Sequence, residues 1–100
     1  MPKLEIKIPH NLSQSEALTR IQRFLPELAV QHSDRISDLE ESWSGKIGEF
    51  KFKISGFKVS GSVTVEDTYV LINGNIPWMA VPFKGQIEST IRQHAEALLK

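Results

Sequence analysis

Histidine is the residue type in this chain that is best suited to metal binding or acid–base catalysis, because its imidazole exchanges a proton near neutral pH. The sequence holds 3 histidines, which are His10, His32 and His94. They lie far apart, and none has a carboxylate partner at the spacing that places two metal ligands on one helix or strand. The pattern therefore predicts no metal site and favours structural roles for the histidines.

Nucleophilic catalysis would need a serine or cysteine beside a base and a third, orienting group. The chain has no cysteine, which excludes thiol catalysis, thiolate metal sites and disulfides. Serines are plentiful, yet none lies in the G-x-S-x-G turn that presents the nucleophile of many hydrolases. No phosphate-binding loop is visible either. We therefore expect a protein that is not an enzyme and uses no cofactor.

A group of aromatic residues could instead line a pocket for an apolar ligand. The candidates are Trp43, Phe50, Phe52, Phe57 and Phe83. In this interpretation an acyl chain would lie between a sheet and the last helix. The alternative is a filled core, because protein interiors pack about as densely as organic crystals. For a chain of 100 residues the filled core is favoured, and the pocket is kept as the alternative.

The spacing of apolar residues predicts the elements that would position these side chains. Residues 3–8 alternate strictly between charged and apolar types, which predicts a strand. Residues 13–16 are Ser-Gln-Ser-Glu, a capping box in which serine and glutamate each bond the other's backbone amide. Pro26 should kink or break the helix that begins there. A last helix is predicted from about residue 82 to residue 99, with a buried stripe of Phe83, Ile87, Ile91, Ala95 and Leu98.

Strand-like runs fill the middle of the chain, at residues 36–43, 46–54, 57–65 and 68–76. In residues 57–65 one face is apolar and the other polar, which is typical of an antiparallel sheet. The order of elements is therefore strand, kinked helix, four strands, helix. This order predicts one α+β domain over residues 1–100, an antiparallel sheet of about five strands with the kinked N-terminal helix and the long C-terminal helix on one face. The layout is analogous to a small helix-grip fold.

Turn residues predict a register for these strands. Two-residue turns are expected at Ser44-Gly45, Ser55-Gly56 and Glu66-Asp67. They would pair Leu39 with Phe50, Phe52 with Val59, Val63 with Val70 and Gly61 with Ile72. Every pair then has its apolar side chains on the same face. Asn73-Gly74 is also typical of a hairpin turn, but too few residues follow for a return strand, so we expect the strand to continue through it.

The same register leaves apolar residues outside the core. Ile47, Tyr69 and Leu71 point to the outer face of the sheet, and Trp78 and Met79 lie in the loop that leaves it. An exposed apolar patch indicates a surface for a partner, a second copy of the chain or a lipid-like phase. The alternative is a set of scattered single exposures, which are common in globular proteins.

Composition and charge limit the class of protein. The hydrophobic fraction of 40% and the charged fraction of 24% are ordinary for a globular domain. The 12 basic residues equal the 12 acidic ones, so the basic surplus that nucleic-acid binders use is absent and no nucleic-acid partner is expected. No segment approaches the ~20 apolar residues of a membrane span, and residues 1–9 lack the apolar run of a signal peptide. We therefore expect a cytoplasmic protein without a transmembrane segment.

Several short motifs in this chain resemble those of one bacterial family. They are Trp43 with Gly45, residues 59–65 (VSGSVTV), residues 76–78 (IPW) and residues 82–88 (PFKGQIE). In order and spacing they are similar to the small bacterial proteins called polyhydroxyalkanoic acid system proteins. The resemblance implies a role in storage-polyester metabolism or at the granule surface, but no reaction and no catalytic residue. On this basis we expect a non-enzymatic accessory or interaction protein, acting as a homodimer or on a granule-associated partner, with a small carrier of an apolar or acyl ligand as the alternative.

Overall fold

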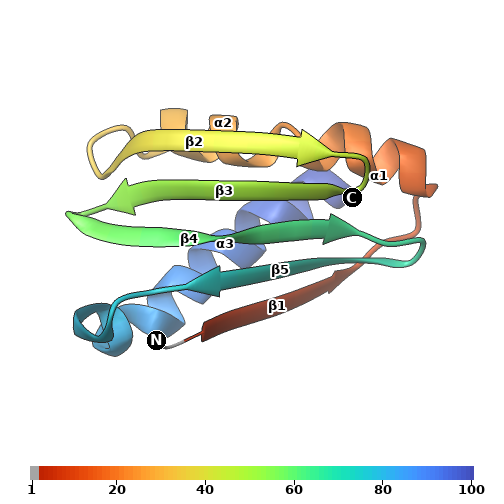
Figure 1. Ribbon diagram of the computed structural model, residues 1–100. Helices are drawn as coiled ribbons and strands as arrows, with labels where there is room; N and C mark the ends of the chain where they lie inside the picture. The colour runs from red at the N-terminus through yellow and green to blue at the C-terminus, as the bar shows by residue number, and fades with distance from the viewer. Residues whose placement is uncertain (1–2) are drawn as a thin grey trace.

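The computed structural model describes residues 3–100 and shows two layers, a sheet and the helices that cover one face of it (Figure 1). The sheet is 5-stranded and antiparallel, in the order β1-β5-β4-β3-β2. Its strands are β1 (Lys3–Pro9), β2 (Ile36–Ser44), β3 (Ile47–Ile54), β4 (Phe57–Val65) and β5 (Tyr69–Asn75). The helices are α1 (Gln14–Ile21), α2 (Phe24–Gln31), the 3₁₀ helix η1 (Trp78–Phe83) and α3 (Lys84–Leu99). The predicted fold class is confirmed.

Strand β1 joins the sheet beside β5, which the sequence pattern did not reveal. The two strands are antiparallel, and Ile6 lies opposite Ile72. Leu4, Ile6 and Ile8 are buried, as the strict alternation predicts. Because β1 pairs with the outer edge of β5, the edge strands of the sheet are β1 and β2. The N-terminal strand and the C-terminal helix thus contribute side chains to the same core.

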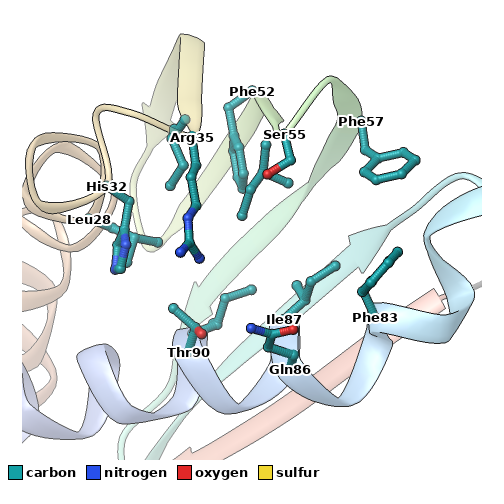
Figure 2. A pocket seen from close by; sticks show the side chains of 13 residues that line it. Leu28, His32, Arg35, Phe52, Ser55, Phe57, Phe83, Gln86, Ile87 and Thr90 are labelled. Atoms are coloured by element: carbon teal, nitrogen blue, oxygen red, sulfur yellow. The ribbon is translucent and has the colours of Figure 1, made fainter.

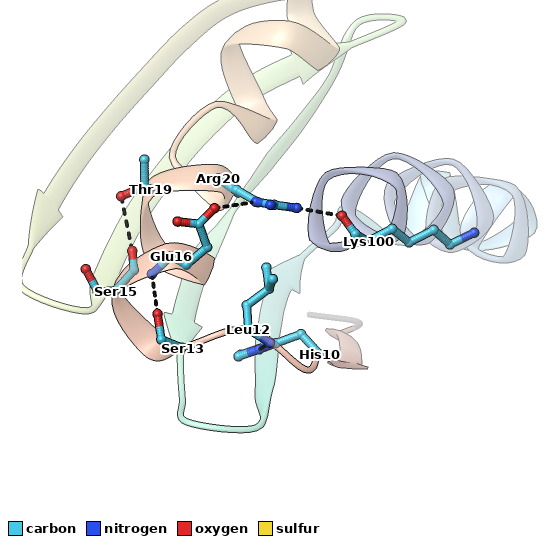
Figure 3. A network of polar contacts seen from close by, with 8 residues as sticks. All are labelled: His10, Leu12, Ser13, Ser15, Glu16, Thr19, Arg20 and Lys100. Atoms are coloured by element: carbon cyan, nitrogen blue, oxygen red, sulfur yellow. Dashed lines mark hydrogen bonds and ion pairs between the residues drawn. The ribbon is translucent and has the colours of Figure 1, made fainter.

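The N-terminal helix begins and breaks close to the predicted places. Ser13 Oγ accepts a hydrogen bond from the Glu16 amide at 3.1 Å. The Glu16 carboxylate does not return to Ser13; it accepts a bond from Arg20, which also donates to the carbonyl of Lys100 and so ties α1 to the end of α3 (Figure 3). The break precedes Pro26, which lies in the first turn of α2. A proline there removes no helical hydrogen bond, because amides of the first turn have no partner within the helix.

The predicted turn between β2 and β3 is wrong by one residue. Ser44 pairs with Ile47, so the turn consists of Gly45 and Lys46, and Gly45 has the positive φ of 60°. Glu41, and not Leu39, therefore lies opposite Phe50. By contrast, the turn at Ser55-Gly56 is confirmed, with Phe52 opposite Val59.

The turn between β4 and β5 is also displaced by one residue. The amide of Glu66 donates to the carbonyl of Tyr69 at 2.8 Å, which leaves Asp67 and Thr68 as the turn. Val63 therefore pairs with Ile72 instead of Val70. Moving a turn by one residue changes each pairing by two residues, so every side chain keeps its predicted face. β5 continues through Asn73-Gly74 to Asn75, as expected.

Helix α3 buries a stripe that differs from the predicted one at both ends. Ile87, Ile91 and Ala95 are buried as predicted, but Leu99 takes the place that Leu98 was given. Phe83 is not in the stripe, since its side chain is 50% exposed. The reason is that residues 78–83 form η1, whose tighter winding places Phe83 out of phase with α3. No helix within residues 3–100 is long and apolar enough to cross a membrane.

Gly61 and Gly74 face each other across β4 and β5, where the sequence predicted Ile72 opposite Gly61. A Cβ atom on Gly61 would clash with the carbonyl oxygen of Asn73 and would lie 2.7 Å from the Cα of Gly74. The close neighbour is thus the backbone of the adjacent strand and not a helix. Only glycine fits, because backbone in a sheet interior cannot retreat without breaking its ladder.

Replacing Gly61 with alanine should therefore destabilise the protein by about 3 kcal/mol or more, through overpacking against backbone. Urea unfolding followed by circular dichroism measures this loss. Gly85→Ala is the matched control, because nothing lies within 4 Å of a Cβ there and alanine favours the helix. Equal stabilities for Gly61→Ala and the control would contradict the close approach of β4 and β5.

Candidate functional site

An open cleft of about 260 Å³ lies between α3 and the β2–β3–β4 end of the sheet (Figure 2). Helix α3 crosses the sheet diagonally, and α2 covers mainly the β2 side (Figure 1), so the region beside the Ser55-Gly56 turn is left without a cover. The floor of the cleft is apolar and consists of Leu28, Ile36, Phe52, Ile54, Ile87 and Ile91. Phe57 and Phe83 flank one end, with ring centroids 6.3 Å apart.

The aromatic residues that were predicted to line a pocket do not all meet. Phe52, Phe57 and Phe83 line the cleft. Phe50 is buried in the core, stacked on Phe52 with centroids 5.9 Å apart. Trp43 is half-buried toward the other end of β2. The structure therefore supplies an apolar cleft between sheet and last helix, although a smaller and more open one than five converging aromatic rings would make.

Polar side chains form the rim of this cleft, and the sequence pattern singled out only His32 among them. The rim consists of His32, Arg35, Ser55, Gln86 and Thr90. Gln86 and Thr90 are four residues apart on α3, and each directly precedes a buried isoleucine. They therefore lie together at the edge of the apolar stripe, and this spacing could have predicted their place on the rim. Arg35 lies in the connection before β2, where neither helical nor strand periodicity applies.

Arg35 directs its guanidinium group into the mouth of the cleft, toward Thr90 on α3 (Figure 2). The side chain is 58% exposed, and its Nε atom lies 3.8 Å from the carboxylate of the neighbouring Asp34. That is a loose ion pair of two exposed groups, which contributes little. Among the described residues that line the cleft none is acidic. The rim therefore carries one cationic side chain and no carboxylate, and the guanidinium of Arg35 makes no hydrogen bond to another group of residues 3–100.

His94 lies near this cleft, between α2 and α3, and is surrounded by apolar and charged groups. Its ring is 5.6 Å from that of Phe24, and its Nε2 atom is 3.7 Å from the carboxylate of Glu27. Burial lowers the pKa of His94; Glu27 opposes this shift and the nearby His32 adds to it. The imidazole is therefore neutral at neutral pH and acts as a packing residue.

The other histidines do not join His94 in a metal site. His10 is buried; its Nδ1 accepts from the Leu12 amide at 3.1 Å, and its Nε2 donates to the Glu66 carbonyl at 3.0 Å. Its ring thus fixes the start of the loop after β1 to the β4–β5 turn. Within residues 3–100 no group of three or more histidine, aspartate or glutamate side chains is arranged to hold a metal ion.

The apolar residues predicted on the surface fall into two separate places. Ile47 and Leu71 lie in one cross-strand row on the outer face, with Thr64 between them. Tyr69 is near this row, and the ammonium group of Lys7 lies 4.4 Å from the centre of its ring. Trp78 belongs to η1, which follows the opposite end of β5.

The η1 segment, residues 78–83, is the larger of these exposed apolar features. Trp78 is 72% exposed and Met79 76%. Val81 and Phe83, which the sequence pattern did not place on the surface, are exposed as well. Trp78 and Met79 thus lie outside the core, as the sequence pattern predicts, and only Ala80 of this segment is buried.

The sequence also matches a known family. Residues 4–99 fit the family model described as "Putative polyhydroxyalkanoic acid system protein (PHA_gran_rgn)". The chain belongs to this family. The resemblance indicated by the short motifs is therefore confirmed, and the match spans nearly all of this chain.

Comparisons with individual proteins add little to the family assignment. No significant match to a curated protein was found. The fold is similar to that in the crystal structure of TTHA0849 from Thermus thermophilus, with a TM-score of 0.39 and 9% sequence identity. The match covers 98% of this chain and 92% of that one.

The environment of His94 predicts how the stability of this polyhydroxyalkanoic acid system protein depends on pH. Because its pKa in the folded state is below the ordinary value of 6.5, the unfolded chain binds more protons between the two values. The free energy of unfolding should therefore fall as the pH is lowered through about 6.5. In His94→Leu this loss should shrink, which urea unfolding at pH 7.5 and pH 5.5 measures. An unchanged difference between the two pH values would show that His94 is not held neutral by burial.

Proposed function

We propose that this family member is a non-enzymatic accessory protein of polyhydroxyalkanoate metabolism that binds an acyl chain in the cleft beneath α3. The observation that carries the proposal is the cleft itself, which has an apolar floor, a polar rim and a mouth that opens to solvent. The family connects the chain to the storage-polyester system. Hydroxyalkanoic acids, the units of such a polyester, combine an acyl chain with a carboxyl group. The protein would bind such an acid in the cytoplasm, at or near the granules.

The size of the cleft supports a ligand with one acyl chain of medium length. A volume of about 260 Å³ exceeds the ~150 Å³ of an apolar cavity that binds benzene. It falls just below the ~300–1,000 Å³ of pockets for drug-sized molecules. Each methylene group transferred from water to such a floor contributes about 0.8 kcal/mol. One chain of medium length is thus the ligand that fits, and a two-chain lipid is too large.

A carrier is favoured over an enzyme because the polar rim lacks a catalytic arrangement. A nucleophile must lie within hydrogen-bond distance of its base, and the base must be oriented by a third group. Within residues 3–100, Ser55 and Thr90 have no hydrogen bond to His32, and Figure 2 shows Arg35 between His32 and Ser55. These groups line the cleft, where they would contact a ligand, and they are not paired to activate one another.

Blocking the mouth of the cleft should abolish acyl binding. Thr90 lines the cleft and is half-buried, so the indole of Thr90→Trp would occupy the space of the ligand. Native mass spectrometry of protein purified from a bacterial host should show a bound acyl species in the wild type and none in this variant. Ser89→Trp is the matched control, because Ser89 is the exposed neighbour on α3. The absence of any acyl species from the wild type, together with no heat on titration with octanoate, would refute the carrier function.

A second candidate function is binding to the granule surface through η1, and the exposure of Trp78 and Met79 favours it. Large apolar side chains at a protruding turn insert readily into a lipid or polymer surface. The outer-face residues Ile47, Tyr69 and Leu71 are less suited to this, because polar side chains and Lys7 surround them. They remain a candidate contact for a partner or a second copy of the chain.

Co-sedimentation with isolated polyester granules tests the η1 surface. Changing Trp78 and Met79 to glutamate should reduce the bound fraction at least about tenfold, since each charge would have to leave water. Val30→Glu is the matched control, because Val30 is 75% exposed on α2, away from η1. If both variants sediment like the wild type, η1 is not a granule-binding element.

A further inference from the structure

We infer that the cleft is specific for an acyl chain that ends in a free carboxylate, and that Arg35 binds this carboxylate at the rim. This inference rests on the acyl-binding function proposed above and adds the chemistry of the head group. It assigns a ligand-binding role to Arg35 on one side of the mouth of the cleft and to Thr90 and Gln86, which lie on α3 on the other side (Figure 2).

The charge of the cleft selects an anion. Arg35 is the one residue with a permanent charge among the described lining residues, and His32 is the one other ionisable group there. No carboxylate of the lining competes for the guanidinium, and the pair with Asp34 is long, at 3.8 Å between Nε and Oδ2. An arginine whose guanidinium makes only this long ion pair, beside an apolar floor, is suited to hold an anionic group in a bidentate manner while the attached chain lies on the floor.

The arrangement of the rim favours a carboxylate over a phosphate head group. A phosphate carries about two charges and is generally held by several cations or by backbone amides of a helix N-terminus. Here a single guanidinium is present, accompanied by the neutral hydroxyl of Thr90 and the amide of Gln86. One guanidinium with two neutral donors matches the charge and the planar shape of one carboxylate.

The chain of the ligand would lie along the floor, away from Arg35. From the Arg35 side, the lining continues over Phe52 and Ile87 toward Phe57 and Phe83 (Figure 2). The cleft thus has a cationic side and an aromatic end. A ligand with an anion at one end and an alkyl chain at the other matches both, whereas a neutral hydrocarbon would leave the guanidinium without a partner.

Isothermal titration calorimetry with octanoate, methyl octanoate and n-octyl phosphate tests the inference on the full-length protein. The wild type should bind octanoate about threefold to fivefold more tightly than the ester, the factor that one well-aligned ion pair at a partly exposed arginine supplies. Arg35→Gln should lose this preference while it still binds the ester. Arg35→Lys should keep part of the preference, because the charge remains but the planar fork is lost. Arg23→Gln is the matched control, since Arg23 is an exposed arginine that pairs with Glu27 outside the cleft.

The outcomes separate this inference from the proposed function. Equal binding of octanoate and its ester by the wild type, or an unchanged preference in Arg35→Gln, would overturn the carboxylate assignment and leave acyl binding intact. If octyl phosphate binds more tightly than octanoate, and this binding depends on Arg35, the head group that the cleft recognises is a phosphate and the carboxylate assignment is wrong. If none of the probes binds the wild type, both the inference and the acyl-binding function fail. Thermal melts of the Arg35 variants confirm that the fold is retained.

Discussion

The helices of this fold do not extend over the whole apolar face of the sheet, and the rest of the structure depends on this constraint. Every strand presents apolar side chains to that face, and α1, α2 and α3 are the α-helices that can cover them. Helix α3 crosses diagonally, and its end is tied to α1 through Arg20 and the carbonyl of Lys100. Since α2 ends at Gln31, the hydrophobic surface beside the β3–β4 turn has no helix above it. The cleft is the part of the core that this geometry leaves uncovered, so it follows from the topology and not from a local peculiarity of sequence.

The sequence predicted the faces of the sheet correctly, but it predicted the strand pairing correctly only between β3 and β4, and the pairings of β2 with β3 and of β4 with β5 are displaced. Alternation of apolar and polar residues determines only which side chains are buried, so a displacement of two residues leaves the pattern unchanged. The turn residues decide the rest, and glycine at Gly45 was compatible with two positions in the turn. At the β4–β5 turn no glycine was present to decide. The place of β1 was also undetermined, because both edges of the meander could accept an apolar strand.

The sequence predicted some of the apolar residues that line the cleft, but it did not predict Arg35 on the rim, which would bind the head group of the ligand. Phe52 and Phe57 were placed because their strands have clear periodicity and a turn of correct register between them. Phe50 shares their face of the sheet but is buried and does not line the cleft, because a shared face does not determine which part of it a helix covers. Arg35 gave no signal, because its position depends on how the connection after α2 meets β2. That connection is irregular, and the bulge between Ser37 and Glu40 further obscures the pattern around it.

Phe83 connects the cleft with the exposed η1 segment, and this makes the two candidate functions physically related. Its ring packs near Phe57 at the aromatic end of the cleft, and it is also the last residue of the exposed turn that begins with Trp78. If η1 inserts into an apolar phase, the aromatic end of the cleft comes to lie at the boundary of that phase. An acyl chain could then pass between the phase and the floor with little exposure to water, while its carboxylate stays at the solvent-exposed Arg35. The hydrophobic effect would thus guide the chain, and the single charge would set its orientation.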